Sequence, residues 1–357
     1  MGAPSRPPAN GFVAAARKVY NPVGFSKGYN FVLWFIFAGA LFGFILARLQ
    51  YLNFYGVYCN PNSRDGALPG ECYYYTKFDR YKVGIILHLA CILPAGLLAI
   101  LQFTPYIRYK AIMAHRVGGW LAILLSVTGI AGALMIARRS FGGGIEAQTV
   151  TGVLAIVFLG SLLLAVINIK KLQIEEHRKW MLRAWFYAGC IITMRLILVI
   201  TNTITASSGY QATMPCAKID FILNSEEELL LSYPACAPFV NGTNLDQYTI
   251  IEANFNGKDA AQIAAAVNIT AGMALWLAFI IHAVGVEIYI HLTPAEHSRL
   301  RAISYQRQLA AGKRNPGSAG LTADRLGDSD GLWTPREERA KGEGADISKD
   351  SLQTPSP

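Results

Sequence analysis

The chain has 357 residues, of which 53% are hydrophobic and only 15% are charged. This composition indicates an integral membrane protein and argues against a large soluble one. The formal net charge of +9 is typical of some nucleic-acid-binding proteins, but the basic residues lie at the ends of apolar segments. We therefore expect contact with the lipid bilayer and no nucleic-acid partner.

Six segments are long and apolar enough to cross a bilayer, which takes about 20 residues in a helix. They are residues 31–48, 83–103, 118–137, 150–169, 181–201 and 271–290. Helices satisfy their own backbone hydrogen bonds in hydrocarbon, so the sequence predicts an all-α, polytopic membrane protein of six transmembrane helices. We expect spans two to five to form a central four-helix bundle. Residues 1–29 form a predicted N-terminal cytosolic arm, and the first span lacks a signal-peptide cleavage site.

The distribution of basic residues predicts the orientation. Lysine and arginine crowd the N-terminal arm and the loops 104–117 and 170–180, whereas the segment 203–261 has two lysines against seven carboxylates. The positive-inside rule therefore places both termini in the cytosol and 203–261 outside. The loop 49–82 is a conflict, because it is predicted to lie outside yet carries four basic residues. The other five segments agree with one another.

Cysteines and a glycosylation sequon support the same orientation. Cys59 and Cys72 lie in the first outer loop, and Cys216 and Cys236 lie in the large outer loop. This placement indicates disulfides formed in an oxidising compartment, with pairing inside each loop the simplest arrangement and pairing between the loops an open alternative. Asn241 begins an N-glycosylation sequon on the same side. We therefore expect the plasma membrane or a secretory-pathway membrane.

Apolar residues become scarce near the end of the chain. After a short basic helix near residues 295–311, the sequence is rich in Gly, Ser, Asp, Lys and Arg. Such a segment buries too little apolar surface to offset its ordering entropy. We expect residues 296–357 to form a disordered cytosolic tail.

Two histidine–arginine pairs stand at matching positions, just before the third and fifth spans. His115 and His177 are predicted to lie at the same depth at the cytosolic edge, as the two axial ligands of one haem would. Arg116 and Arg178 could then meet the haem propionates. The alternative is that these residues anchor the helices among lipid phosphates.

Ionisable residues inside the predicted spans are the other candidates. His88 and Arg195 each lie about 10 Å below the outer face, counting 1.5 Å per residue. An arginine at that depth costs several kcal/mol unless it is paired or reaches water. The candidate partners of Arg195 are His88, helix carbonyls, an outer-loop acid such as Glu146, or an anionic ligand.

These residues form a pattern that resembles a known family. The pattern runs through His88, His115-Arg116-Val117-Gly118, His177-Arg178-Lys179-Trp180-Met181-Leu182-Arg183 and Arg195. It is similar to that of predicted bacterial and fungal membrane proteins that carry a domain of unknown function, and it covers about residues 80–202. Gly119-Trp120 departs from the family, in which an arginine and an aromatic residue are expected. The resemblance implies a four-helix, histidine-containing core, similar in outline to di-haem cytochromes, with His88 as a further haem ligand.

The sequence leaves two hypotheses of function. The first is electron transfer through a b-type haem to a redox partner. The alternative is a non-enzymatic transporter or scaffold that binds a small molecule or lipid. We find no phosphate-binding loop, nucleophile elbow or zinc-type spacing, so we assign neither catalytic residues nor a metal site.

Overall fold

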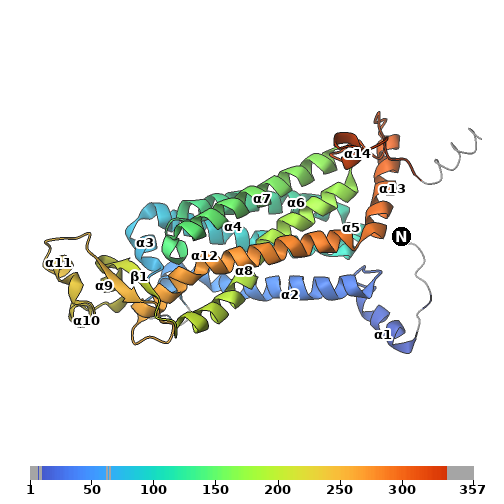
Figure 1. Ribbon diagram of the computed structural model, residues 1–357. Coiled ribbons are helices and arrows are strands. Elements are labelled where there is room, and N and C mark those ends of the chain that lie inside the picture. Colours follow the sequence, from blue (N-terminus) through green and yellow to red (C-terminus); the bar gives the residue numbers. More distant parts are fainter. Residues whose placement is uncertain (1–6, 8–9, 62, 64–65, 336–357) are drawn as a thin grey trace, which may run out of the picture. The chain divides into compact units, whose positions relative to one another are not determined.

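The computed structural model describes residues 7, 10–61, 63 and 66–335. Within this part, six helices are long and apolar enough to cross a membrane (Figure 1). They are α2 (Gly28–Leu49), α4 (Asp79–Phe103), α6 (Ile112–Ile136), α7 (Ile145–Lys170), α8 (Ile174–Thr205) and α12 (Ala260–His291). The predicted all-α class with six transmembrane helices is confirmed.

Each of these helices extends beyond the apolar segment that predicted it. The helix α8, for example, begins at Ile174, seven residues before the predicted span at Met181, and includes Glu175 and Glu176 in its first turn. Carboxylates near a helix N-terminus interact favourably with the helix dipole, so charged residues can continue the helix where the bilayer meets water. His115 and His177 therefore both lie within helices, in α6 and α8.

The chain divides into two compact units. Unit 1 consists of Met1–Ala155 and Ala188–Ile281, and unit 2 consists of Ile156–Tyr187 and His282–Pro357. The boundaries fall inside the helices α7, α8 and α12, so each of these helices contributes residues to both units.

Unit 1 contains a close helical hairpin, α4–α6, joined through the short helix α5 (Pro105–Lys110). The two backbones approach so closely at Gly132 that a Cβ placed there would lie 2.6 Å from the carbonyl oxygen of Gly84. One turn away, Nδ1 of His88 is 2.8 Å from the carbonyl oxygen of Gly129. Small residues allow such close packing in membranes, and a polar side chain then bonds across the interface. The two helices are therefore closely packed at these glycines.

The long segment between α8 and α12 folds as part of the same unit. It contains two antiparallel strands, β1 (Gln211–Pro215) and β2 (Tyr248–Glu252). Three short helices lie between them in the sequence: α9 (Cys216–Leu223), α10 (Glu226–Ser232) and α11 (Ala237–Val240). Its core includes Ile219, Leu229 and Ile251, each no more than 1% exposed. The sequence analysis predicted no strands here.

Both disulfides form within their own loops. Cys59 is bonded to Cys72, which begins the helix α3 (Cys72–Lys77), and Cys216 is bonded to Cys236. The predicted use of these four cysteines is confirmed, and pairing within each loop is the correct alternative. Cys91 and Cys190 are the free cysteines of the described residues.

The remaining helices lie at the two ends of the chain. In unit 1, α1 (Gly11–Tyr20) begins at Asn10, whose side chain accepts a hydrogen bond from the backbone of Val13. In unit 2, α13 (Pro294–Ala310) and α14 (Ala323–Leu326) follow the last span.

The expectation of a tail disordered from residue 296 differs from the structure, which is folded up to residue 335. The buried side chains of Gln173 and Gln308 bond to each other, at 2.8 Å, and to backbone amides of Gly317 and Gly320. Arg301 pairs with Asp324. This network satisfies the hydrogen-bonding groups of the segment without a large apolar core, and composition alone does not reveal such a network. Residues 336–357 lie outside the described residues.

Candidate functional site

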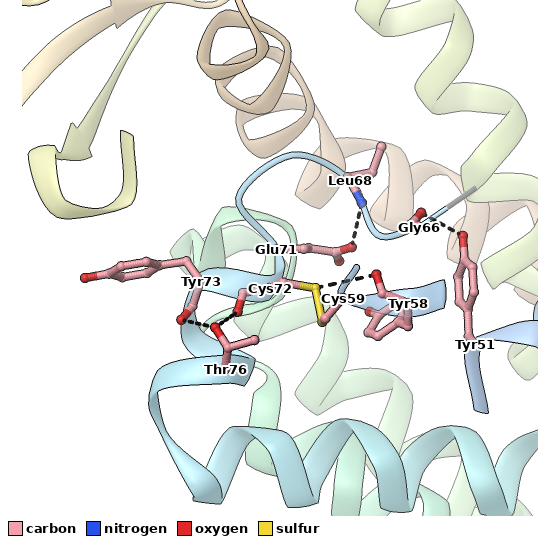
Figure 2. Close-up of a disulfide and its surroundings, with 9 residues drawn as sticks. All are labelled: Tyr51, Tyr58, Cys59, Gly66, Leu68, Glu71, Cys72, Tyr73 and Thr76. Atoms are coloured by element: carbon pink, nitrogen blue, oxygen red, sulfur yellow. Dashed lines mark hydrogen bonds between the residues drawn. A yellow bond between two sulfur atoms is a disulfide. The ribbon is translucent and has the colours of Figure 1, made fainter. Parts of the chain in front are cut away.

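A partly buried charge cluster in unit 1 begins with Glu71. This residue immediately precedes Cys72, so the Cys59–Cys72 disulfide fixes its backbone (Figure 2). Its Oε2 accepts a hydrogen bond of 3.3 Å from the backbone amide of Leu68. The preceding loop is held by Tyr51, whose hydroxyl donates to the carbonyl oxygen of Gly66. The disulfide and these hydrogen bonds thus hold the Glu71 carboxylate in position just before α3.

Glu71 lines a small cavity of about 10 Å³, which has room for about one water molecule. The lining side chains come from segments far apart in the sequence, and two of them, Arg139 and Lys218, are cationic. The other lining residues are Leu68, Pro69, Phe141, Gly142, Ala264, Val267 and Asn268. The cavity is therefore a polar one with charged walls.

Two further cations act on the same carboxylate. The charges of Arg195, Lys218 and Arg48 all act on Glu71. We call Arg48, Arg139, Arg195 and Lys218, together with Glu71, the cationic cluster. Among the described residues, no ion pair within 4.0 Å includes any of the five. Three cations thus act on one carboxylate, and the fourth, Arg139, lines the same cavity.

Aromatic rings replace carboxylates as the close neighbours of these cations. The guanidinium carbon of Arg139 lies 4.2 Å from the ring centre of Tyr74, and that of Arg195 lies 4.6 Å from the ring centre of Phe141. Arg48 lies 5.0 Å from the ring of Tyr51. Cation–π contacts stabilise a cation without neutralising it. The cluster therefore keeps an excess of positive charge.

Some of the hydrogen-bonding capacity of the cluster is unused. The Nε atoms of Arg48, Arg139 and Arg195 are buried and have no hydrogen-bond partner in the described protein. A buried donor without a partner costs about 1–3 kcal/mol. These donors and the excess positive charge both favour an acceptor that carries negative charge.

Burial changes the pKa of both the carboxylate and the amine. Burial raises the pKa of Glu71, although Arg195 and the amide of Leu68 act in the opposite direction. Lys218 is 5% exposed, and its burial lowers its pKa to about 8 against the attraction of Glu71. Lys218 is therefore still protonated at neutral pH, but the folded protein holds that charge at a cost.

The structure brings one of the predicted site residues into this cluster. Arg195 was expected to need a partner, and the carboxylate whose charge acts on it is Glu71. The sequence analysis missed the other four members, which lie in loops or at helix ends. A usable signal was present: Glu71 and Lys218 each lie within two residues of a disulfide cysteine, and Lys218 is a rare cation in an acidic segment.

The predicted haem ligands belong to both units. His88 and His115 lie in unit 1, whereas His177 lies in unit 2. Nδ1 of His177 is 2.9 Å from the carbonyl oxygen of Ala165, and the same kind of contact joins His282 to Phe186 in unit 2. No cluster of three or more metal-binding side chains is present among the described residues. Ligation of one haem by His115 and His177 stays a prediction.

The predicted partners of the haem propionates belong to different units. Arg116 is exposed on α6 in unit 1. Arg178, in unit 2, donates a hydrogen bond of 3.2 Å to the hydroxyl of Tyr289. Their role toward a propionate stays a prediction.

Comparison with known proteins agrees with this membrane architecture. Residues 85–217 match the model of DUF2306, described as a predicted membrane protein. This part of the chain is similar to that family. The DUF2306 match contains Arg139 and Arg195 and ends next to Lys218, whereas Arg48 and Glu71 precede it.

A curated relative extends the similarity beyond that domain. The chain is 23% identical over 329 residues to a protein of Aspergillus versicolor named Ava biosynthesis cluster protein G. The match covers 79% of this chain and 94% of the relative. No solved structure matches the chain.

Proposed function

We propose that this multi-pass membrane protein binds the charged end of an anionic small molecule in the cationic cluster. The observation that carries the proposal is a small cavity lined by Glu71, Arg139 and Lys218, with the charges of Arg195 and Arg48 also acting on Glu71, so that four cations accompany one carboxylate. Burying charge is unfavourable unless an opposite charge or hydrogen bonds compensate for it. A carboxylate or phosphate would supply both, because arginine binds such groups with two parallel hydrogen bonds.

The size of the cavity limits how the ligand binds. About 10 Å³ accommodates one oxygen-sized group, so the remainder of the ligand must lie outside the present cavity. The name of the Aspergillus relative refers to a biosynthesis cluster, which favours a small organic compound, and the cations favour one with a carboxylate or phosphate group. We propose binding or transport of such a compound, without a catalytic step, at the plasma membrane or a secretory-pathway membrane.

Thermal unfolding in the presence of different anions tests the proposal. Purified protein in lipid nanodiscs is heated in sodium succinate, sodium phosphate or sodium chloride of equal ionic strength. We expect succinate or phosphate to raise the Tm of the wild type above its value in chloride. The increase should be lost in Arg195→Gln and Lys218→Gln and retained in Lys258→Gln, which removes an exposed lysine of the same outer segment. Equal increases in all four proteins would refute specific binding.

Haem-dependent electron transfer is the second candidate. The contact of His177 Nδ1 with the carbonyl of Ala165 favours it, because metal-ligating histidines typically have the ring oriented by such a hydrogen bond. The test is a reduced-minus-oxidised visible spectrum of protein purified with added haem. Sharp α and β bands that disappear in His177→Ala and in His115→Ala are the expected result. A colourless protein would exclude this candidate.

A further inference from the structure

The N-terminal helix α1 is tied to the first turns of the membrane-spanning helix α2, in unit 1. A Cβ placed at Gly28 would lie 3.4 Å from the ring of Tyr20, the last residue of α1, and the ring centres of Tyr20 and Phe31 are 6.2 Å apart. In the linker that follows α1, the ring of Phe25 packs on Phe31 and Trp34, with centres 5.8 and 5.5 Å apart. Because α2 begins at Gly28, these contacts hold the end of α1 at the level where the span begins.

The same linker is bonded to the short helix α5. The backbone amide of Tyr106 donates a hydrogen bond of 3.1 Å to the carbonyl oxygen of Val23. Gly24, with a φ of +93°, allows this approach, since a Cβ there would lie 2.8 Å from the same amide nitrogen. The helix α5 begins two residues after the span α4 ends, so both segments lie at one end of the spans of unit 1 (Figure 1). We call residues 11–27 and 105–110 the collar.

The outward face of α1 is apolar. Phe12, Ala15 and Val19 are three or four residues apart, which places them on one side of the helix. All three are exposed, Phe12 to 81% and Val19 to 61%, whereas Tyr20 on the other side is buried. An exposed apolar face with flanking basic residues, held beside a membrane boundary, is typical of a helix that lies in the lipid interface.

The collar carries basic and aromatic side chains but no acidic ones. Lys18, Lys27 and Lys110 are exposed, and so are Tyr106 and Tyr109. Neither part of the collar contains an aspartate or a glutamate. Tyrosine and lysine favour the headgroup level of a membrane, which is also the level set by the starts and ends of the spans. The position and the charge of the collar therefore agree.

We propose that the collar binds the headgroups of anionic phospholipids in the leaflet at this end of the spans. Lys27 and Lys110 each lie four residues from the hydrogen bond between Val23 and Tyr106, so both ammonium groups belong to the same part of the collar. They bind the lipid phosphates, and the apolar face of α1 rests on the boundary between headgroups and acyl chains. Val19, the exposed apolar residue nearest to α2, lies deepest.

Charge decides which lipids the collar selects. Basic residues close to a membrane attract anionic lipids through the net charge of the headgroup, and no carboxylate of the collar opposes this attraction. A zwitterionic headgroup carries one ammonium for each phosphate and has no net charge to attract. The collar thus favours anionic over zwitterionic lipids. This proposal does not depend on the cationic cluster.

Lipid retention tests the collar. The full-length protein is reconstituted into nanodiscs of equal parts phosphatidylglycerol, phosphatidylethanolamine and phosphatidylcholine, re-extracted in mild detergent, and analysed by native mass spectrometry. We expect the lipid retained by the wild type to be enriched several-fold in phosphatidylglycerol. The double variant Lys27→Gln, Lys110→Gln should lose most of this enrichment. The control variant Lys77→Gln, Lys258→Gln removes two exposed lysines outside the collar and should keep it.

A fluorescent label tests whether α1 reaches the lipid. The label is attached to Val19→Cys, or to Leu231→Cys as a control, after Cys91 and Cys190 are replaced by alanine. Leu231 is 82% exposed and lies in α10, at the opposite end of unit 1 (Figure 1). Brominated acyl chains in the nanodisc should quench the label at position 19 several-fold more than the label at position 231. The proposal is overturned if the wild type does not prefer phosphatidylglycerol, if Lys27→Gln, Lys110→Gln retains as much of it as the wild type, or if both labels are quenched equally.

Discussion

Replacing Lys218 by methionine tests whether the cationic cluster is short of negative charge. Lys218→Met keeps most of the side-chain volume and removes the buried ammonium group. Glu71 is left with the charges of Arg195 and Arg48 acting on it. If the cluster has excess positive charge when no ligand is bound, this substitution should stabilise the protein instead of disrupting it.

The magnitude follows from the pKa of the lysine. Burial lowers that pKa from its ordinary value of 10.5 to about 8. Each pKa unit corresponds to about 1.4 kcal/mol, so holding the charge at pH 7 costs the folded state about 3 kcal/mol. Between pH 8 and pH 10.5 the unfolded state binds more protons than the folded state, so the stability of the wild type rises with pH in this window. The cost is fully present below pH 8 and absent above pH 10.5.

The assay is thermal unfolding in mild detergent without added phosphate, followed by tryptophan fluorescence at pH 7 and pH 9.5. We expect Lys218→Met to raise the free energy of unfolding by up to about 3 kcal/mol at pH 7, and by only about 1 kcal/mol at pH 9.5. Lys258→Met, at an exposed position of the same outer segment, should change neither value. A lower Tm for Lys218→Met, or the same gain at both pH values, would refute the reasoning.

Three further predictions concern the α4–α6 hairpin, the Cys59–Cys72 disulfide and the glycosylation sequon at Asn241. Gly132→Ala should destabilise the α4–α6 hairpin by about 1–3 kcal/mol, because its Cβ would contact backbone atoms of Gly84 and His88, whereas Gly152→Ala, which has nothing within 4 Å, should be neutral in the same unfolding assay. The double variant Cys59→Ser, Cys72→Ser opens a 13-residue loop and should lower the free energy of unfolding by about 3 kcal/mol. The prediction is contradicted if the variant, the oxidised wild type and the reduced wild type all have the same Tm. Asn241 is exposed, and its Oδ1 accepts a hydrogen bond of 2.7 Å from the Thr243 hydroxyl, so we expect a glycan there. Asn241→Gln should then migrate like enzymatically deglycosylated wild type on a gel, and equal mobility of untreated wild type and variant would exclude the glycan.

Local sequence properties determined the membrane architecture. A run of about 20 apolar residues can satisfy its backbone in hydrocarbon only as a helix, so composition within a short window was sufficient for all six spans. The two disulfides were predictable for a similar reason, since each cysteine pair lies within one loop. The ends of the helices were not predictable in this way. The charged first turn of α8, at Glu175 and Glu176, is helical yet lies outside any apolar window.

The candidate site was decided by tertiary structure. Arg195 was identifiable because a charge inside an apolar run is conspicuous, but Glu71 and Lys218 are ordinary residues of polar loops, and only folding buries them around one cavity. The same applies to Arg183 and Glu287, which are 104 residues apart and pair on two different helices. The folding of residues 311–335 likewise depends on the buried side chains of Gln173 and Gln308. Helix formation in a membrane depends on residues that are neighbours in the sequence. Burial and pairing of charges depend on tertiary contacts between distant segments, and these contacts cannot be read from a single sequence.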